Sequence, residues 1–283
     1  MLPLVLTAVL FAETPVKPML DDLLETGVAV PGGPKVKLPK PIAKADPTAE
    51  DRKKIAAWIR NEVNNDVFLE DDRARYYYKS KSVEGKQPYH IVTVAFIAYG
   101  TLARLEKEKL LEGLLGSKEG KGKKPNDLTD NDLKVRKIVR IPKKVAAERY
   151  SVIDASLADE VRITGVMRNQ TWKSKGQITS VSILDDRWLE DKDNPNLSRK
   201  ITLIKGVLGE TEAKPYSGFG GYARVTELDD PKGALFIEMV FIYHEPKEWF
   251  NGRALLVPKL KIGIDDNIVI FRRSLRTVPK PKP

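Results

Sequence analysis

The second half of the chain is a series of short segments rich in β-branched and aromatic residues, with no long helical period between them. Turn-forming stretches such as Lys173–Gly176 and Asp229–Gly233 separate these segments. Closely spaced strands without helical crossovers pair antiparallel, so residues 145–276 are predicted to form an antiparallel sheet, as a sandwich or a partly open barrel. The strands are expected near 148–154, 160–172, 177–187, 200–208, 221–228, 234–244 and 267–273.

Residues 48–116 carry a different pattern. Thr48 and Asp51 have the spacing of a capping box, and apolar residues then recur three and four positions apart, which predicts a helix over 48–64. Segments 73–79 and 89–99 resemble two strands of a hairpin, and a leucine-faced helix is expected from Leu102 to Gly116. The predicted fold class is therefore α+β, with a helix–two strands–helix portion followed by the antiparallel β portion.

The chain opens with an uncharged apolar run, residues 2–12. Eleven residues are too few to span a bilayer, which needs roughly 20, so no transmembrane span is predicted here. The run has the length of the apolar core of a secretory signal peptide, and residues 1–12 are interpreted as one, although no basic residue precedes them and Leu10 is large for a cleavage motif. The alternative is a buried N-terminal strand. The signal-peptide interpretation predicts an exported protein, periplasmic, envelope-associated or extracellular, rather than a cytoplasmic one.

N-terminal sequencing of the mature protein from fractionated cells tests this expectation. A signal peptide is removed on export, so the mature chain should begin near Glu13 and be found in an extracytoplasmic fraction. An intact Met1 in the cytosol would contradict export.

Residues 13–47 are rich in proline, with Gly32–Gly33 in their middle. Proline removes backbone donors and fixes φ, so this stretch is predicted to be an extended linker with polyproline character. The alternative is a strap that packs on the surface of the folded domain.

The formal net charge of +10 is concentrated in two places. Residues 118–149 hold eleven basic and five acidic residues, and residues 272–283 hold five basic residues and no acid. This pattern predicts a basic loop with a short helix over 117–144 and a basic, Pro-rich tail over 277–283. Such islands attract polyanions, although they can equally be solubilising segments. The candidates for anion contact are Lys121, Lys123, Lys124, Arg272, Arg273 and Arg276.

Cysteine is absent and there are only two histidines, His90 and His244. Disulfide scaffolds, thiolate zinc sites and cysteine nucleophiles are therefore excluded. No motif has the spacing of a known catalytic, cofactor or metal site, so no such residue is predicted and an enzyme is the less favoured class. His244 and Glu245 end a strong strand, and His90 begins another, so the two histidines would meet only if their strands were neighbours.

Three further motifs have weak functional interpretations. Asp191, Asp193 and Asn196 begin to match a calcium loop, but the glycine and glutamate that an EF-hand requires are missing. The glycine cluster 217–222 leads into a strand rather than a helix, which favours a close backbone approach over a phosphate loop. Asn169 and Asn196 each begin an N-x-S/T triplet.

Three functions follow as hypotheses. The leading one is an exported, non-catalytic binding or structural module of the cell envelope, whose partner is a polyanion or another envelope protein. The second is a nucleic-acid or polyanion binder that uses the basic loop and tail. The third is a carboxylate-dependent hydrolase with His244 or Glu245 at a cleft.

Overall fold

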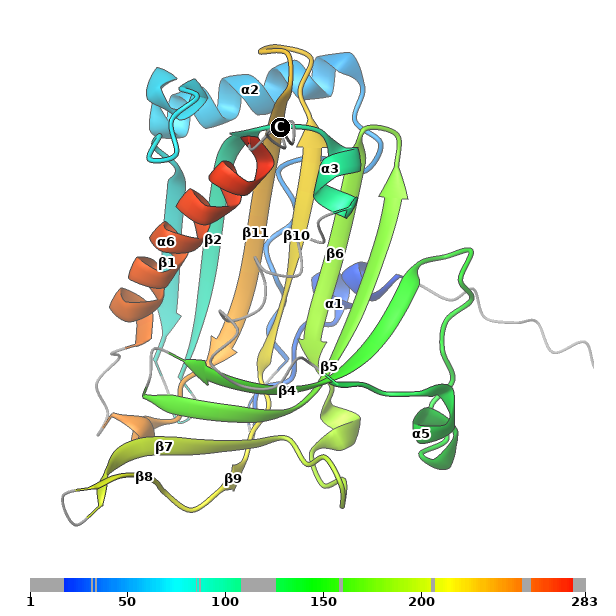
Figure 1. Ribbon diagram of the computed structural model, residues 1–283, viewed down its shortest axis with the longest axis vertical. Helices are drawn as coiled ribbons and strands as arrows, with labels where there is room; N and C mark the ends of the chain where they lie inside the picture. Colours follow the sequence, from blue (N-terminus) through cyan, green and yellow to red (C-terminus); the bar gives the residue numbers. More distant parts are fainter. Residues whose placement is uncertain are drawn as a thin grey trace, which may run out of the picture.

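The computed structural model describes residues 18–31, 33, 35–84, 86, 88–107, 126–157, 160–204, 207–250 and 256–276. The protein is an α+β protein built on one mostly antiparallel sheet that curls into a half-barrel (Figure 1). The main path of the sheet runs β1-β2-β11-β10-β6-β5-β4-β3, and β7 with β8 and β9 continues from β5. The strands are β1 (Tyr77–Val83), β2 (Tyr89–Tyr99), β3 (Asn126–Asp127), β4 (Ala147–Leu157), β5 (Val161–Ser174), β6 (Gln177–Leu184), β7 (Leu197–Ile204), β8 (Val207–Glu210), β9 (Lys214–Pro215), β10 (Phe219–Glu227) and β11 (Ala234–His244).

The two predicted halves of the chain meet inside this sheet. β2 comes from the first half and β11 from the second, and they pair antiparallel along their whole length, from Tyr99 opposite Ala234 to Tyr89 opposite His244. Strands of both predicted portions therefore lie in one sheet, and the main buried cluster includes residues of both, such as Val92 and Ile237.

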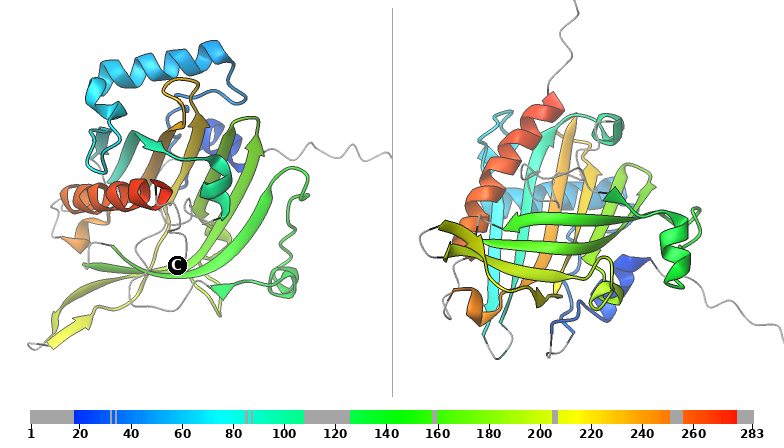
Figure 2. Two further views of the ribbon diagram at one scale, coloured as in Figure 1. Left: turned by 45° about the horizontal axis from the view of Figure 1, so that its top comes forward. Right: turned by 60° about the horizontal axis from the view of Figure 1, so that its bottom comes forward.

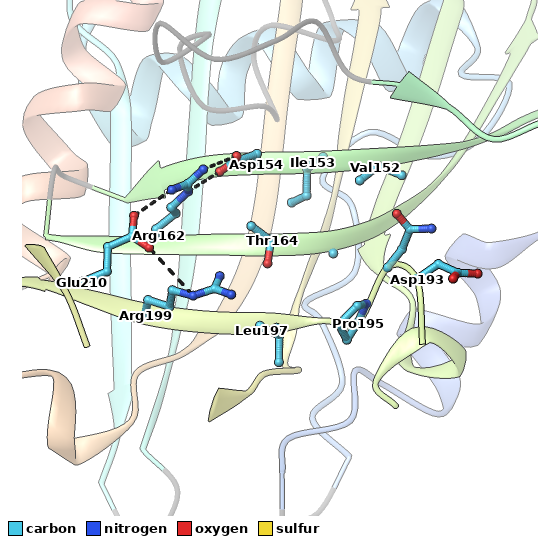
Figure 3. A pocket seen from close by; sticks show the side chains of 12 residues that line it. Val152, Ile153, Asp154, Arg162, Thr164, Asp193, Pro195, Leu197, Arg199 and Glu210 are labelled. Carbon is cyan, nitrogen blue, oxygen red and sulfur yellow. Dashed lines mark hydrogen bonds and ion pairs between the residues drawn. The ribbon is translucent and has the colours of Figure 1, made fainter. Parts of the chain in front are cut away.

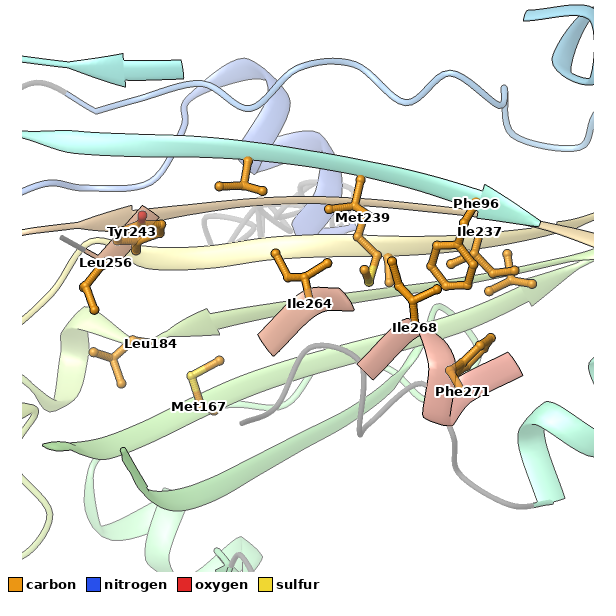
Figure 4. Close-up of a cluster of buried hydrophobic side chains, with 14 of the residues drawn as sticks. Phe96, Met167, Leu184, Ile237, Met239, Tyr243, Leu256, Ile264, Ile268 and Phe271 are labelled. Atoms are coloured by element: carbon orange, nitrogen blue, oxygen red, sulfur yellow. The ribbon is translucent and has the colours of Figure 1, made fainter. Parts of the chain in front are cut away.

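The concave face of the sheet holds the main core together with helix α6 (Leu256–Arg276). Ile264, Ile268 and Phe271 point from α6 onto strand residues such as Phe96 and Ile237 (Figure 4). The rings of Phe96 and Phe271 meet edge to face, with centroids 5.7 Å apart, a favoured aromatic geometry. The predicted strand over 267–273 is wrong, because these residues lie in α6. A helical repeat of apolar side chains outweighs the local preference of the run Ile268–Phe271 for a strand.

Several segments cover the convex face of the sheet. Helix α2 (Ala49–Val63) lies across one end of the sheet and buries Ile55, Ala56 and Ile59 against it (Figure 2). The capping box between Thr48 and Asp51 is formed as the sequence predicts. The other helices of the described residues are α1 (Met19–Glu25), α3 (Leu102–Lys107) and α5 (Asp130–Val135), with single 3₁₀ turns η1 (Asn65–Phe68), η2 (Asp186–Trp188) and η3 (Lys247–Trp249). The predicted leucine helix over 102–116 is seen as α3, and its remainder lies outside the described residues.

The second cover of the convex face is the strap, residues 18–47 as far as they are described. This part of the stretch expected to be a Pro-rich linker packs on the sheet, which matches the alternative interpretation. The reason is its apolar content: α1 and the antiparallel bridge between Val28 and Val36 bury their side chains against strand residues including Tyr222 and Val240. Residues 1–17, with the predicted signal peptide, lie outside the described part of the chain.

Two buried charged residues hold the strap in place. Glu238 of β11 accepts hydrogen bonds from the backbone N–H of Ile42 at 2.7 Å and of Ala43 at 3.0 Å. Its cross-strand partner Arg224 donates to the carbonyl of Ala43 and to Thr179 Oγ1. Burial raises the pKa of Glu238 to about 7, and these backbone donors and Arg224 only partly oppose that shift.

Candidate functional site

The basic residues of helix α6 bind the chain's own groups. Arg272 is buried, and its guanidinium donates to the backbone carbonyls of Ile97, Asp72, Ala74 and Arg75. Arg273 and Arg276 form ion pairs with Asp72 at 3.2 and 2.8 Å. These three predicted anion contacts thus fasten the segment around residues 70–75 to the helix. The other three, Lys121, Lys123 and Lys124, lie outside the described residues, as does the tail 277–283.

The aspartates of the acidic loop considered as a calcium site form ion pairs within the protein. Asp191 and Asp193 both bind Arg136, each with a shortest contact of 2.6 Å, and the hydrogen bond from Arg136 lowers the pKa of Asp191 to about 2. Asn196 is buried, accepting from the backbone N–H of Val166 at 2.9 Å and donating to the carbonyl of Asp185 at 2.8 Å. The three side chains do not converge, and the described part of the chain holds no cluster of three metal-ligating residues.

A groove lies on the convex side of the sheet where β4, β5 and β7 run side by side (Figure 3). Its volume is about 490 Å³, which is within the usual range for small-molecule sites. Strand, bulge and loop residues line it: Val152, Ile153, Asp154, Arg162, Thr164, Gly165, Asp193, Asn194, Pro195, Leu197, Arg199 and Glu210. Apolar and charged side chains therefore face the same space.

Gly165 creates the step in the sheet that forms this groove. β5 pairs with β6 from Met167 onward and with β7 up to Thr164, and the change of partner falls on Gly165. Gly165 has φ +156°, and a Cβ there would stand 2.3 Å from Oδ1 of Asn196. Only glycine leaves room for the buried amide of Asn196 to lie this close to the backbone of β5. The shape of the groove therefore depends on glycine at position 165.

The two arginines of the groove differ in how strongly they are paired with carboxylates. Arg162 binds Asp154 through two nitrogens at 2.6 and 2.5 Å and Glu210 through a third at 2.7 Å. These bonds raise the pKa of Arg162 and lower that of Asp154. Arg199 differs, because its ion pair within the described residues is a 3.8 Å contact with Glu210. Its guanidinium therefore keeps most of its hydrogen-bonding capacity for a group in the groove.

Apart from Asp193, which was considered as a calcium ligand, none of these groove residues was singled out from the sequence. The sequence carries a signal for Asp154 and Arg162, which lie at outward positions of their strands between apolar neighbours. It carries none for Arg199, which lies between Ser198 and Lys200. Finding them required the pairing of β5 with β7, which places Arg162 opposite Arg199.

The two histidines lie on opposite faces of neighbouring strands. His90 is paired with Tyr243, on the concave side, and His244 is paired with Tyr89, on the convex side. Burial lowers the pKa of His244 to about 4, so its imidazole is neutral at pH 7. The ring of Tyr216 stacks on His244 at 6.2 Å. His244 therefore takes a packed position, and of the acid–base residues considered only Glu245 reaches His90, at 3.0 Å.

Comparisons with known proteins place the chain near no characterised family. No protein-family model matches it, and no curated protein is similar in sequence. Similar solved structures include the human StarD13 (DLC2) lipid transfer and protein localization domain, with a TM-score of 0.37 and 10% identity over 72% of this chain and 91% of that one. Human STARD10 gives 0.33 and 9% over 82% and 86%.

A third similar structure is a putative uncharacterized protein from Rhizobium leguminosarum, with a TM-score of 0.30 and 9% identity over 70% of this chain and 98% of that one. With TM-scores below 0.5, none of these similarities assigns a function to this chain. Within the described residues, none of the helices has both the length and the apolar character needed to cross a membrane.

Proposed function

We propose that the protein is a binding module that holds a small molecule with an anionic head and a short apolar body in the groove between β4, β5 and β7. The observation that carries this proposal is the position of Arg199. It is the groove arginine whose ion pairing in the described structure is weak, while the carboxylates beside it are already engaged by Arg162. A carboxylate or phosphate placed there would gain charge-assisted hydrogen bonds.

The rest of the lining supports a short apolar body. Val152, Pro195 and Leu197 lie beside the charged residues and would contact aliphatic carbons. The groove is built on paired strands and on the rigid step at Gly165, so it exists before any ligand binds, which lowers the entropic cost of binding. Export, expected from the apolar run at residues 2–12, would place this groove in the cell envelope or outside the cell.

Calorimetry with three probes of one length tests the groove. Hexanoate should bind more tightly than hexanol and hexylamine, because only hexanoate offers an anion to Arg199. Replacing Arg199 with glutamine should weaken hexanoate binding by roughly tenfold or more, since hydrogen bonds to charged groups contribute about 1.5–3 kcal/mol.

Arg149→Gln is the matched control. Arg149 also lies on a strand of this region, β4, and has a long ion-pair contact of 3.4 Å with Asp127, but it does not line the groove. Its replacement should leave hexanoate binding unchanged. The proposal fails if hexanoate does not bind, if hexanol binds equally well, or if the two arginine variants lose affinity alike.

A further inference from the structure

The side chains of Ser82, His90 and Glu245 lie next to one another at the end of the β1–β2 hairpin. Oγ of Ser82 lies 2.8 Å from Nδ1 of His90, and Nε2 of His90 lies 3.0 Å from Oε2 of Glu245. Ser82 is exposed, whereas His90 and Glu245 are 1% and 3% exposed. The order is that of a nucleophile, a base and a group that orients the base, with only the nucleophile open to solvent.

Rigid elements hold this line of groups. Ser82 and His90 are direct partners in the antiparallel pairing of β1 with β2, so their side chains share one face. Glu245 directly follows β11, and its N–H donates to the carbonyl of Pro88 at 3.1 Å. The His90 ring also packs against Tyr243, with centroids 4.9 Å apart. The imidazole is therefore fixed from three sides.

The glutamate selects the tautomer of the histidine. A carboxylate facing Nε2 favours the proton on that nitrogen, which leaves the lone pair of Nδ1 facing the hydroxyl of Ser82. The Nε2–H is not aligned on Oε2 at this 3.0 Å separation, as is common for catalytic hydrogen bonds before substrate binds. Nδ1 is thus placed to take the proton of the Ser82 hydroxyl.

We propose that Ser82 is the nucleophile of a second site, separate from the groove, that hydrolyses esters of small acyl groups. His90 Nδ1 takes the proton as Ser82 Oγ forms a bond to the ester carbonyl carbon. The proton then passes to the leaving alkoxide, which departs as an alcohol and leaves an acyl-serine. Water, deprotonated by His90, attacks this acyl group, and the free acid leaves as Oγ recovers its proton.

The position of Ser82 sets the substrate class. Within the described residues β1 is the terminal strand of the sheet and pairs with β2, so alternate backbone N–H groups along its other edge can donate to a developing oxyanion. Ser80, Lys81 and Ser82 are all exposed on this strand. An edge with exposed serine and lysine side chains offers few apolar contacts to a long acyl chain, so we expect compact acyl groups and compact acylating reagents to react readily there.

The full-length protein treated with a fluorophosphonate probe, followed by peptide mass spectrometry, gives the first test. Ser80 is the internal control, because it is exposed on the same strand and the same face but stands opposite Val92 instead of His90. Ser82 should be modified at least tenfold faster than Ser80. Equal labelling of the two serines, or none at Ser82, would overturn the proposal, and this test uses the unaltered protein.

Variants separate the roles of the three groups. Ser82→Ala should abolish both probe labelling and the hydrolysis of p-nitrophenyl acetate above background, while Ser80→Ala leaves both unchanged. Glu245→Gln tests the positioning residue: labelling of Ser82 should slow at least tenfold, and the midpoint of its pH–rate profile should move to lower pH. A folded Glu245→Gln protein with an unchanged profile would contradict the role given to Glu245.

Discussion

Replacing Arg272 with methionine is expected to lower the free energy of unfolding by about 3–5 kcal/mol. The guanidinium of Arg272 is buried against the ring of Phe96, and it donates to Ile97 O at 2.8 Å and Arg75 O at 3.1 Å among its carbonyl partners. Methionine fills much of the volume but donates nothing, so these carbonyls would be left buried without partners. Urea denaturation monitored by circular dichroism measures the loss.

The neighbouring residue provides the control. Arg273 lies one position along α6, its side chain is 65% exposed, and it pairs with Asp72 at the surface. Exposed ion pairs contribute about 0–1 kcal/mol, so Arg273→Met should change the unfolding free energy by no more than that. If the two variants were equally stable, Arg272 would not hold the 70–75 segment, and it would again be a candidate for binding an external anion.

The second large effect is a pH dependence that comes from Glu238. Its pKa is about 7 in the folded protein, against the usual 4.5 in an unfolded chain. Between these values the folded state binds the proton more tightly than the unfolded state, so this contribution to stability is present at low pH and is lost as the pH rises to 7. The shift corresponds to about 3 kcal/mol. Glu238→Gln cannot titrate and should lack this contribution.

The measured quantity is the difference in unfolding free energy between the wild type and Glu238→Gln, from about pH 4 to about pH 8. As the pH rises over this range, the unfolding free energy of the wild type should fall by about 3 kcal/mol relative to that of the variant. Subtracting the variant removes the contributions of other groups, including His244, which acts in the opposite sense: its lowered pKa adds stability at neutral pH that is lost in acid.

Glu148 is the matched control because its shift has the other sign. Burial raises its pKa, but hydrogen bonds from the Ile141 N–H, Arg168 and Gln170 outweigh burial, and the net shift is downward. As the pH rises from the acidic range, the unfolding free energy of the wild type should therefore increase relative to that of Glu148→Gln. Parallel pH profiles for the two variants would show that Glu238 does not titrate as proposed.

Local patterns predicted most of the sheet. The strands at 234–244 and 89–99 were predicted with their observed bounds, and the capping box at Thr48 follows from short-range signals. The first strand of the hairpin was predicted at 73–79, but β1 spans Tyr77–Val83. Helix α6 did not follow from such signals, since Ile268, Val269 and Ile270 are strong strand formers. The helix depends on Ile264, Ile268, Phe271 and Leu275 sharing one face over several turns, and on a concave sheet that covers this face.

The candidate sites were beyond the reach of local patterns. The groove requires β5 to change partners at Gly165, and the line from Ser82 to Glu245 requires β2 to pair with β11. The alternation of the hairpin could have placed Ser82 opposite His90, but nothing local in the sequence indicates that Glu245 lies beside them. Such contacts depend on strand order, which periodicity does not encode.

The pairing of β2 with β11 has a consequence for biosynthesis. The middle of the sheet joins residues about 140 positions apart, so it cannot form until residues 234–244 have left the ribosome. Until then β2 exposes a long apolar edge that can pair with strands of other chains. A nascent protein of this architecture should depend on chaperones that shield Tyr89–Tyr99, and fragments that end before residue 234 should aggregate instead of folding as a smaller domain.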